Sequence, residues 1–201
     1  MSNKRPFKII EFPIPVNLSN RHVHPCQKDV ETLFGKGYQL KKLRDLYQPG
    51  QYVSQETVTL VGPKRNIEKV HLLGPLRDKT QVEISRTDAF ALGIEVPLRN
   101  SGALKGSAPI TIVGPKGKIA LKEGCILEQR HLHLSLEDAK KLKIKDGQIV
   151  AILAGRGKGR ETIFFDVICK ISENYLSECH LDLDEGNAAL VNNGDFVYLV
   201  E

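Results

Sequence analysis

The feature that most constrains the fold of this chain is an internal repeat. The segment VTLVGPKRNI at residues 58–67 matches ITIVGPKGKI at residues 110–119. Each is an apolar run, a Gly-Pro-Lys turn and a second strand-like run, and this pattern predicts a β-hairpin. Because the hairpin occurs twice, we expect a mainly β chain built from pseudo-symmetric parts.

A second element lies downstream of each hairpin and is repeated too. The segments VEISRTDAFALGI (residues 82–94) and LHLSLEDAKKLKI (residues 132–144) each read as a short strand, a serine and a short helix. Ser85 and Ser135 have the position of helix N-caps, and each has an aspartate three residues later, as in a capping box. The element therefore predicts a strand that runs directly into a capped helix.

Two weaker copies of this strand–helix element occur at residues 23–34 and 181–191. A chain of 201 residues is long enough for one large domain or two small ones. The repeats predict a fold of pseudo-repeated β-barrels whose ends are capped by short α-helices.

Alignment of the four copies places metal-ligand residue types at equivalent positions. One position holds His24, Glu83, His133 and Asp182, and the position two residues earlier holds His22, Gln81, His131 and His180. Side chains two residues apart on a strand point to the same face. Five of the six histidines of the chain occupy these positions, and only His71 does not.

These residues predict metal binding. Imidazole is the commonest metal ligand, and glutamate is a good oxygen ligand for zinc. An isolated His-x-His pair is more often a surface or hydrogen-bonded pair, but two pairs in equivalent repeats favour a metal. Six ligands suit two metal ions, or one ion with catalytic histidines beside it, while Gln81 and Asp182 would support the ligands from outside. The candidate ligands are His22, His24, Glu83, His131, His133 and His180.

One arginine lies close to the predicted ligands in sequence. Arg77 comes six residues before Glu83, just ahead of the ligand strand. Its guanidinium could bind an oxyanion beside the metal, although a surface position is the simpler interpretation. The basic, glycine-rich segment AGRGKGRET (residues 154–162) could hold phosphate, but it lacks the Walker pattern and is interpreted as a solvated hairpin tip. NSGALKGSAP (residues 100–109) is interpreted as a connection between repeats.

The four cysteines show no CxxC pairing and no disulfide framework. Cys26 and Cys179 stand near histidines and could be ligands or nucleophiles, but a small buried apolar role is commoner. The sequence shows no signal peptide and no run of eighteen apolar residues. We therefore expect a cytoplasmic protein with reduced thiols and no membrane segment.

Together, the motifs SNRHVH, TLVGPK, LGPLRDKTQVEISRTDA, RHLHLS and CHLDLDEGNAA resemble the PduL-type phosphotransacylases (phosphate propanoyltransferases). The resemblance covers nearly the whole chain. It implies transfer of a short acyl group, such as propanoyl or acetyl, between coenzyme A and inorganic phosphate. It also implies two β-barrels capped by short helices, a dinuclear zinc site and a place in propanediol degradation.

The resemblance further implies a role for individual residues. His22, His24 and Glu83 would hold the first zinc, which meets the coenzyme A sulfur. The second zinc, with waters or phosphate, would be held by His131, His133 and His180. Arg77 would position phosphate. The coenzyme A site would be lined by Ser19, Arg44, His71, Leu73 and Asn187, where His71 stands in place of a more usual arginine.

The family's topology implies one barrel from residues 11–20 with 129–201 and another from residues 21–128, with residues 35–55 as a lid. A homo-oligomer is expected. Some family members carry an N-terminal helix that directs them into a bacterial microcompartment; no such helix is evident here, which favours the cytoplasm. The implied partners are coenzyme A, acyl-CoA, phosphate and acyl phosphate.

Two other functions compete with acyl transfer. A dinuclear zinc site with bound water can also hydrolyse esters or phosphoesters. A non-enzymatic module could bind nucleic acid through the net charge of +5, but the chain has no tryptophan and few aromatic residues, and its histidines are clustered. We therefore expect neither nucleic acid nor membrane as a partner.

Overall fold

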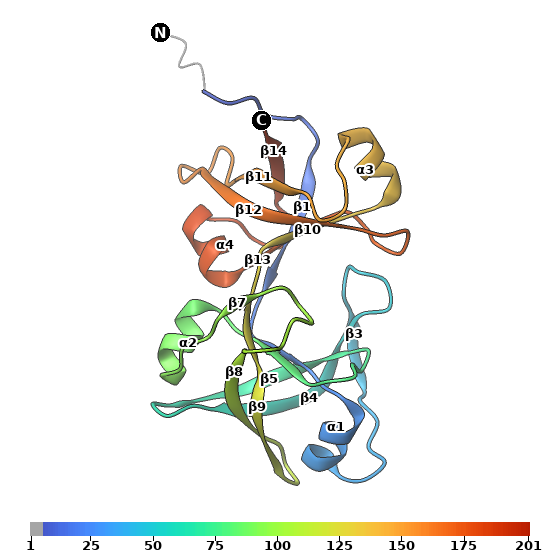
Figure 1. Cartoon of the computed structure of the whole chain (residues 1–201), viewed down its shortest axis with the longest axis vertical. Coiled ribbons are helices and arrows are strands. Elements are labelled where there is room, and N and C mark those ends of the chain that lie inside the picture. The colour runs from blue at the N-terminus through green and yellow to red at the C-terminus, as the bar shows by residue number, and fades with distance from the viewer. Residues whose placement is uncertain (1–5) are drawn as a thin grey trace. The chain divides into compact units, whose positions relative to one another are not determined.

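The computed structural model describes residues 6–201, which form two compact units. Of the described residues, the first unit contains 6–19 together with Arg130–Glu201, and the second contains Asn20–Gln129. Strands dominate both units, and four short helices accompany them (Figure 1). The prediction of a mainly β chain with short helices is confirmed, whereas the predicted domain boundaries and lid stay predictions.

The first unit contains a closed barrel of six strands. Its pairings run from β1 to β13, β10, β12, β11 and β14, and β14 returns to β1. The strands are β1 (Ile14–Ser19), β10 (His131–Leu134), β11 (Ile149–Ala154), β12 (Thr162–Ile171), β13 (Glu178–Asp182) and β14 (Phe196–Val200). The helices are α3 (Leu136–Leu142), which follows β10, and α4 (Leu183–Ala189), which follows β13. Buried Leu132, Ile152 and Leu199 belong to its core.

The second unit is an eight-stranded sheet with two helices. The strands are β2 (His22–His24), β3 (Lys42–Asp45), β4 (Tyr52–Val61), β5 (Asn66–Gly74), β6 (Gln81–Glu83), β7 (Leu98–Arg99), β8 (Ala108–Val113) and β9 (Lys118–Glu128). The helices are α1 (Gln27–Phe34) and α2 (Arg86–Leu92). Within this sheet, pairings run from β4 to β5, β2, β6, β9 and β8, and β8 pairs with β4 again.

The closed series of strand pairings in the two units follow one pattern of parallel and antiparallel neighbours. Where β10 pairs in parallel with β12 and antiparallel with β13, β2 pairs in parallel with β5 and antiparallel with β6. The parallel pair β1–β13 likewise matches β6–β9. This agreement supports the predicted repeat of one domain, which itself stays a prediction.

Both predicted hairpins are present, as β4–β5 and β8–β9. Each packs its turn against the end of a helix. The backbone N–H of Lys64 donates to the carbonyl oxygen of Leu92 at 3.0 Å, and that of Lys116 donates to the carbonyl oxygen of Leu33 at 2.9 Å. These bonds satisfy carbonyl groups that a helix leaves open at its C-terminal end. The repeated Gly-Pro-Lys therefore serves helix termination as well as chain reversal.

The glycine of the β8–β9 turn is required by close packing. A Cβ atom at Gly114 would lie 2.6 Å from the carbonyl oxygen of Leu33 and 2.8 Å from its Cβ. The third hairpin, β11–β12, shows the same contact, because a Cβ at Gly155 would lie 2.1 Å from the carbonyl oxygen of Ala189 at the end of α4. The glycine-rich segment 154–162 is thus a hairpin tip, as predicted, but its first glycine is fixed by packing.

The predicted helix caps are confirmed. Ser85 Oγ accepts the backbone N–H of Asp88 at 3.2 Å, and Ser135 Oγ accepts that of Asp138 at 3.1 Å. Such caps satisfy one of the N–H groups that the first turn of a helix leaves without a partner. Within residues 6–201, no helix is long and apolar enough to cross a membrane.

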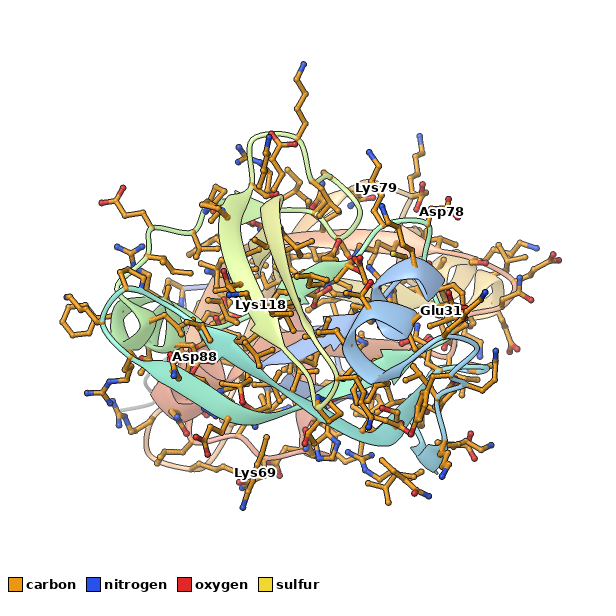
Figure 2. The ribbon with its side chains drawn as sticks, turned by 90° about the horizontal axis from the view of Figure 1, so that it is seen from below. Glu31, Lys69, Asp78, Lys79, Asp88 and Lys118 are labelled. Carbon is orange, nitrogen blue, oxygen red and sulfur yellow. The ribbon has the colours of Figure 1, made fainter. Side chains whose placement is uncertain are left out.

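We predict that Gly114→Ala destabilises the protein by about 1–3 kcal/mol, because the new methyl group must displace the backbone at the end of α1. Chemical denaturation followed by circular dichroism measures this change. Lys118→Ala is the matched control, since Lys118 is an exposed residue of the same hairpin (Figure 2) and its loss should change stability by no more than about 0.5 kcal/mol. Equal stability of the two variants would contradict the close approach.

Candidate metal centres

The first candidate centre lies where β2 pairs with β6. The antiparallel register sets His22 opposite Glu83 and His24 opposite Gln81, so the three predicted ligands share one face. His22 Nε2 lies 3.1 Å from His24 Nε2 and 3.1 Å from Glu83 Oε2, and His24 Nε2 lies 3.4 Å from Glu83 Oε1. All three side chains are buried. We call these three residues the β2–β6 cluster.

The backbone fixes the orientation of one imidazole in this cluster. His22 Nδ1 lies 2.7 Å from the carbonyl oxygen of Asn20, an acceptor only, so Nδ1 carries the proton. The lone pair of the neutral ring is then on Nε2, which faces His24 and Glu83. A carbonyl partner that sets the tautomer in this way is typical of metal-ligating histidines.

Charges inside the cluster are set by mutual contact. Burial alone would raise the pKa of Glu83, but His22 and His24 hold it well below its usual range. Burial also lowers the pKa of His24 to about 4, so this ring is neutral at pH 7. For His22, burial lowers the pKa but Glu83 outweighs it, and the net shift is upward. The cluster thus offers one carboxylate and at least one neutral imidazole, a donor set suited to zinc.

A loop holds the carboxylate of this cluster in place. Gln81 Nε2 donates to Glu83 Oε1 and, at 2.8 Å, to Ser101 Oγ. The backbone N–H of Gly102 donates to Gln81 Oε1 at 2.7 Å. Arg77 Nη1 donates to the same Ser101 Oγ at 2.9 Å. Gln81 therefore holds the carboxylate of the candidate ligand Glu83, and Ser101 links Gln81 to Arg77.

Arg77 is close enough for its charge to act on the cluster. Its positive charge makes protonation of both His22 and His24 less favourable. This effect is smaller than those of burial and Glu83, so the pKa of His22 is still raised on balance while that of His24 is lowered. Its backbone N–H donates to the carbonyl oxygen of Pro25 at 2.9 Å, which ties the segment before β6 to the end of β2. The guanidinium thus lies beside the candidate ligands.

The second candidate centre lies where β10 pairs with β13. His131 is opposite His180, and His133 is opposite Glu178. The His131 and His180 rings stack with centroids 4.6 Å apart, and the His133 ring lies 4.7 Å from His131 and 4.8 Å from His180. One ligand atom of each histidine lies within 4.8 Å of the others. We call these three histidines the β10–β13 cluster.

One ring of this cluster is neutral, and the cluster carries buried nitrogens without a hydrogen-bond partner. Burial, followed by the charges of His180 and Lys170, lowers the pKa of His133 to about 3. His133 Nδ1 is buried and has no hydrogen-bond partner, and the ring stacks on Tyr175 at 4.2 Å. An unpaired buried nitrogen costs free energy unless a ligand uses it. The three imidazoles therefore fit a transition metal such as zinc.

Glu178 was missed by the sequence analysis. It is 4% exposed, and its Oε2 lies 2.8 Å from the buried His180 Nε2, a close contact that lacks hydrogen-bond geometry. The signal that could have found it is its spacing, since Glu178 and His180 stand two residues apart on β13, as His131 and His133 do on β10.

The predicted role of Asp182 is wrong. Asp182 is the N-cap of α4, where its side chain accepts the backbone N–H of Glu185 at 2.8 Å. It is thus equivalent to Ser85 and Ser135, and the correct counterpart of Glu83 is His180. The fourth repeat had been aligned two residues too late, because a capping aspartate and a ligand carboxylate look alike in sequence.

Cys26 occupies the N-cap position of α1. It makes no side-chain cap; instead, Thr80 Oγ1 accepts the Cys26 N–H at 3.0 Å and donates to Asp29 Oδ2 at 2.5 Å. All four cysteines are free, and Cys179 is fully buried in a hydrophobic core, as predicted. Neither cysteine belongs to a candidate cluster.

The residues predicted to bind coenzyme A lie on both units. Arg44 on β3 pairs with Val53 on β4, which pairs with Leu73 on β5, so these residues are in register across three strands. His71 shares the face of Leu73, and its Nδ1 lies 3.0 Å from the carbonyl oxygen of Ser54. In the first unit, Ser19 ends β1 and Asn187 is an exposed residue of α4.

Comparison with known proteins gives consistent matches. A family model described as phosphate propanoyltransferase matches residues 15–192. A curated protein named phosphate propanoyltransferase from Thermotoga maritima is 50% identical over 188 residues, or 94% of this chain and 89% of that protein. Proteins of the same name from Lachnoclostridium phytofermentans and Salmonella typhimurium are 49% and 48% identical, over 94% and 90% of this chain and 88% and 85% of their own lengths. The family match includes both clusters.

Proposed function

Because the chain belongs to the phosphate propanoyltransferase family and is therefore an acyltransferase, we propose that it exchanges a short acyl group between coenzyme A and inorganic phosphate. The acyl group would be propanoyl or acetyl. The observation that carries this proposal is the pair of buried or largely buried clusters of candidate ligands inside the matched region, with an arginine beside one of them.

We propose two zinc ions per chain, which together form a dinuclear zinc site. His22, His24 and Glu83 would hold one ion, and His131, His133 and His180 the other. When bound, the ions would supply Lewis-acid chemistry, one for the thiolate of coenzyme A and the other for phosphate. The support is the donor chemistry of each cluster and the unpaired Nδ1 of His133.

Side chains of the chain would position the phosphate. Arg77 uses Nη1 for Ser101, which restrains the guanidinium and leaves its other N–H groups for an oxyanion. Such a restrained fork can bind two phosphate oxygens at once, as a lysine cannot. Ser101 also donates to Glu83 Oε1 at 3.2 Å, so one hydroxyl would couple the phosphate contact to a metal ligand.

The reaction needs no covalent bond to the protein. An oxygen of phosphate attacks the thioester carbonyl carbon, a C–O bond forms, the C–S bond breaks, and coenzyme A leaves as its thiolate. Holding two substrates in line lowers the entropic part of the barrier. Cys26 as a nucleophile is the rival route; its place at the N-cap of α1, outside both clusters, favours the direct transfer.

The coenzyme A site would be formed by Ser19, Arg44, His71, Leu73 and Asn187. Arg44 is an exposed cation on an edge strand, suited to the phosphates of the nucleotide. The contact of His71 Nδ1 with the carbonyl oxygen of Ser54 fixes the orientation of this ring. Residues 35–55 would act as a lid, and a homo-oligomer in the cytoplasm with a role in propanediol degradation completes the proposal.

The proposed activity is tested by incubating purified protein with propanoyl-CoA and phosphate. We expect propanoyl phosphate and free coenzyme A in equal amounts, and elemental analysis should find about two zinc ions per chain, since the ligands exceed one open tetrahedral site. Release of propanoate without acyl phosphate would instead identify a hydrolase. If elemental analysis finds no transition metal in protein that has been incubated with excess zinc, the zinc proposal is refuted.

Arg77→Ala should lower turnover and phosphate affinity while metal content stays unchanged. Loss of one charge-assisted, bidentate contact should raise the barrier by about 2–4 kcal/mol, or roughly 30- to 1000-fold in rate. Steady-state kinetics with varied phosphate measures the effect. Lys79→Ala is the matched control: it removes the same charge two residues later from an exposed side chain at the outer surface (Figure 2) and should behave like wild type. Unchanged kinetics of Arg77→Ala would remove this residue from the mechanism.

Replacement of His24 and of Cys26 should have opposite consequences. His24→Ala should lose about one zinc ion per chain and nearly all activity, because a ligand and its orientation are lost. Cys26→Ser should keep most activity and both ions. Mass spectrometry of the enzyme with acyl-CoA adds a direct check. An acyl group trapped on Cys26, together with an active His24→Ala, would establish the covalent route instead.

A further inference from the structure

The helix N-caps align the four strand–helix elements without ambiguity. The N-caps are Cys26, Ser85, Ser135 and Asp182. Two residues before them stand His24, Glu83, His133 and His180, and four residues before them stand His22, Gln81, His131 and Glu178. Six of these eight residues are the proposed zinc ligands. The other two, Gln81 and Glu178, occupy the same position in the two units.

Gln81 shows what this position does in the second unit. Its amide N–H groups donate to the ligand Glu83 and to Ser101, and its carbonyl oxygen accepts the N–H of Gly102. All of its contacts therefore serve to hold Glu83 and bind it to a loop. A carboxylate ligand is an acceptor only, so the residue that holds it must be a donor.

Glu178 stands beside an imidazole instead. Its Oε2 lies 2.8 Å from His180 Nε2, a close contact in which the ring is not yet turned into hydrogen-bond geometry. Its backbone lies opposite His133 in the strand register. It is 4% exposed, so its carboxyl group lies in the protein interior and not in bulk water. An imidazole that binds a metal through one nitrogen carries a proton on the other, and the residue that holds it must be an acceptor. Glutamate in place of glutamine meets this requirement.

We propose that Glu178 is the positioning residue of the β10–β13 cluster. Its carboxylate would accept the Nε2–H of His180 when that ring binds zinc through Nδ1, and so hold the ring in place. Gln81 and Glu178 thus occupy the same position in the two units, and each holds the proposed ligand two residues later. Gln81 donates a hydrogen bond to a carboxylate ligand, whereas Glu178 offers an acceptor to an imidazole ligand. This role rests on the proposed zinc binding of the cluster.

The test measures zinc affinity of the β10–β13 cluster alone. In a His24→Ala background the other cluster is disabled, and competition with a chromophoric chelator reports the remaining ion. Glu178→Gln keeps the size of the side chain and removes its charge, so zinc affinity should fall by about 10- to 100-fold. Glu178→Ala should lose at least as much. Glu173→Gln is the matched control, because Glu173 is an exposed residue of the connection between β12 and β13. This variant should bind zinc as tightly as its parent.

A second readout separates positioning from general stability. Nitrogen NMR of the zinc-loaded protein reports which nitrogen of His180 carries the proton, and Glu178→Gln should mix the two tautomers. The unfolding midpoint of the metal-free protein should stay within the range of the Glu173→Gln control. Equal zinc affinity in the Glu178 variants and their parent would overturn the proposal. A loss as complete as that of His180→Ala would make Glu178 a ligand and overturn it as well.

Failure of the proposed function gives a different result. If the wild-type chain binds no zinc and forms no acyl phosphate, the proposed function and the role of Glu178 are rejected together. If the wild-type chain binds two ions and forms acyl phosphate, while Glu178→Gln binds zinc as tightly as its parent, only the role of Glu178 is rejected.

Discussion

Antiparallel pairing between a His-x-His strand and a second ligand strand is the contact on which both candidate centres depend. In β2–β6 and in β10–β13, direct cross-strand partners lie on the same face, so two residues from each strand converge. A shift of one residue would turn every ligand to the opposite face. Val23 and Val82, and in the other unit Leu132 and Cys179, fill the opposite face with buried apolar groups and so fix the register.

The arginine that precedes each His-x-His motif reinforces this register. Arg21 Nε lies 2.9 Å from Asp88 Oδ1, and Arg130 Nε lies 2.6 Å from Glu185 Oε1. Each acidic partner is the third residue of the helix that follows the opposite ligand strand. Each arginine thus forms an ion pair with the helix that follows the opposite strand of its pair. Because these ion pairs are partly exposed, they contribute little to the free energy of unfolding, and their main effect is to keep the two strands in register. This explains why the whole motif Arg-His-x-His, and not the histidines alone, occurs twice.

The sequence predicts which side chains come together in the two clusters, because this depends on local spacing, and it fails where contacts are remote. His22, His24 and Glu83 share a face by the strand period of two, and Ser85 caps its own helix. Ser101 could not be found in this way. It lies 24 residues after Arg77 in a loop that resembles a plain connection, and only the folded chain brings the two together. Glu178 was missed for a different reason. The capping residue Asp182 resembles a ligand carboxylate, so it was aligned with Glu83, and Glu178 then fell outside the aligned positions.

The ligand strands also impose a demand on the rest of the fold. They are only three to five residues long, and more than half of their residues are polar, of a kind that core packing would avoid. Each polar group buried without a partner costs about 1–3 kcal/mol. Long hairpin strands such as β4 and β12 supply apolar core residues that offset this cost. The four short strands thus carry the candidate ligands on one face and core residues on the other, and the hairpins supply further core residues. Any cation bound by the clusters would add stability by mass action.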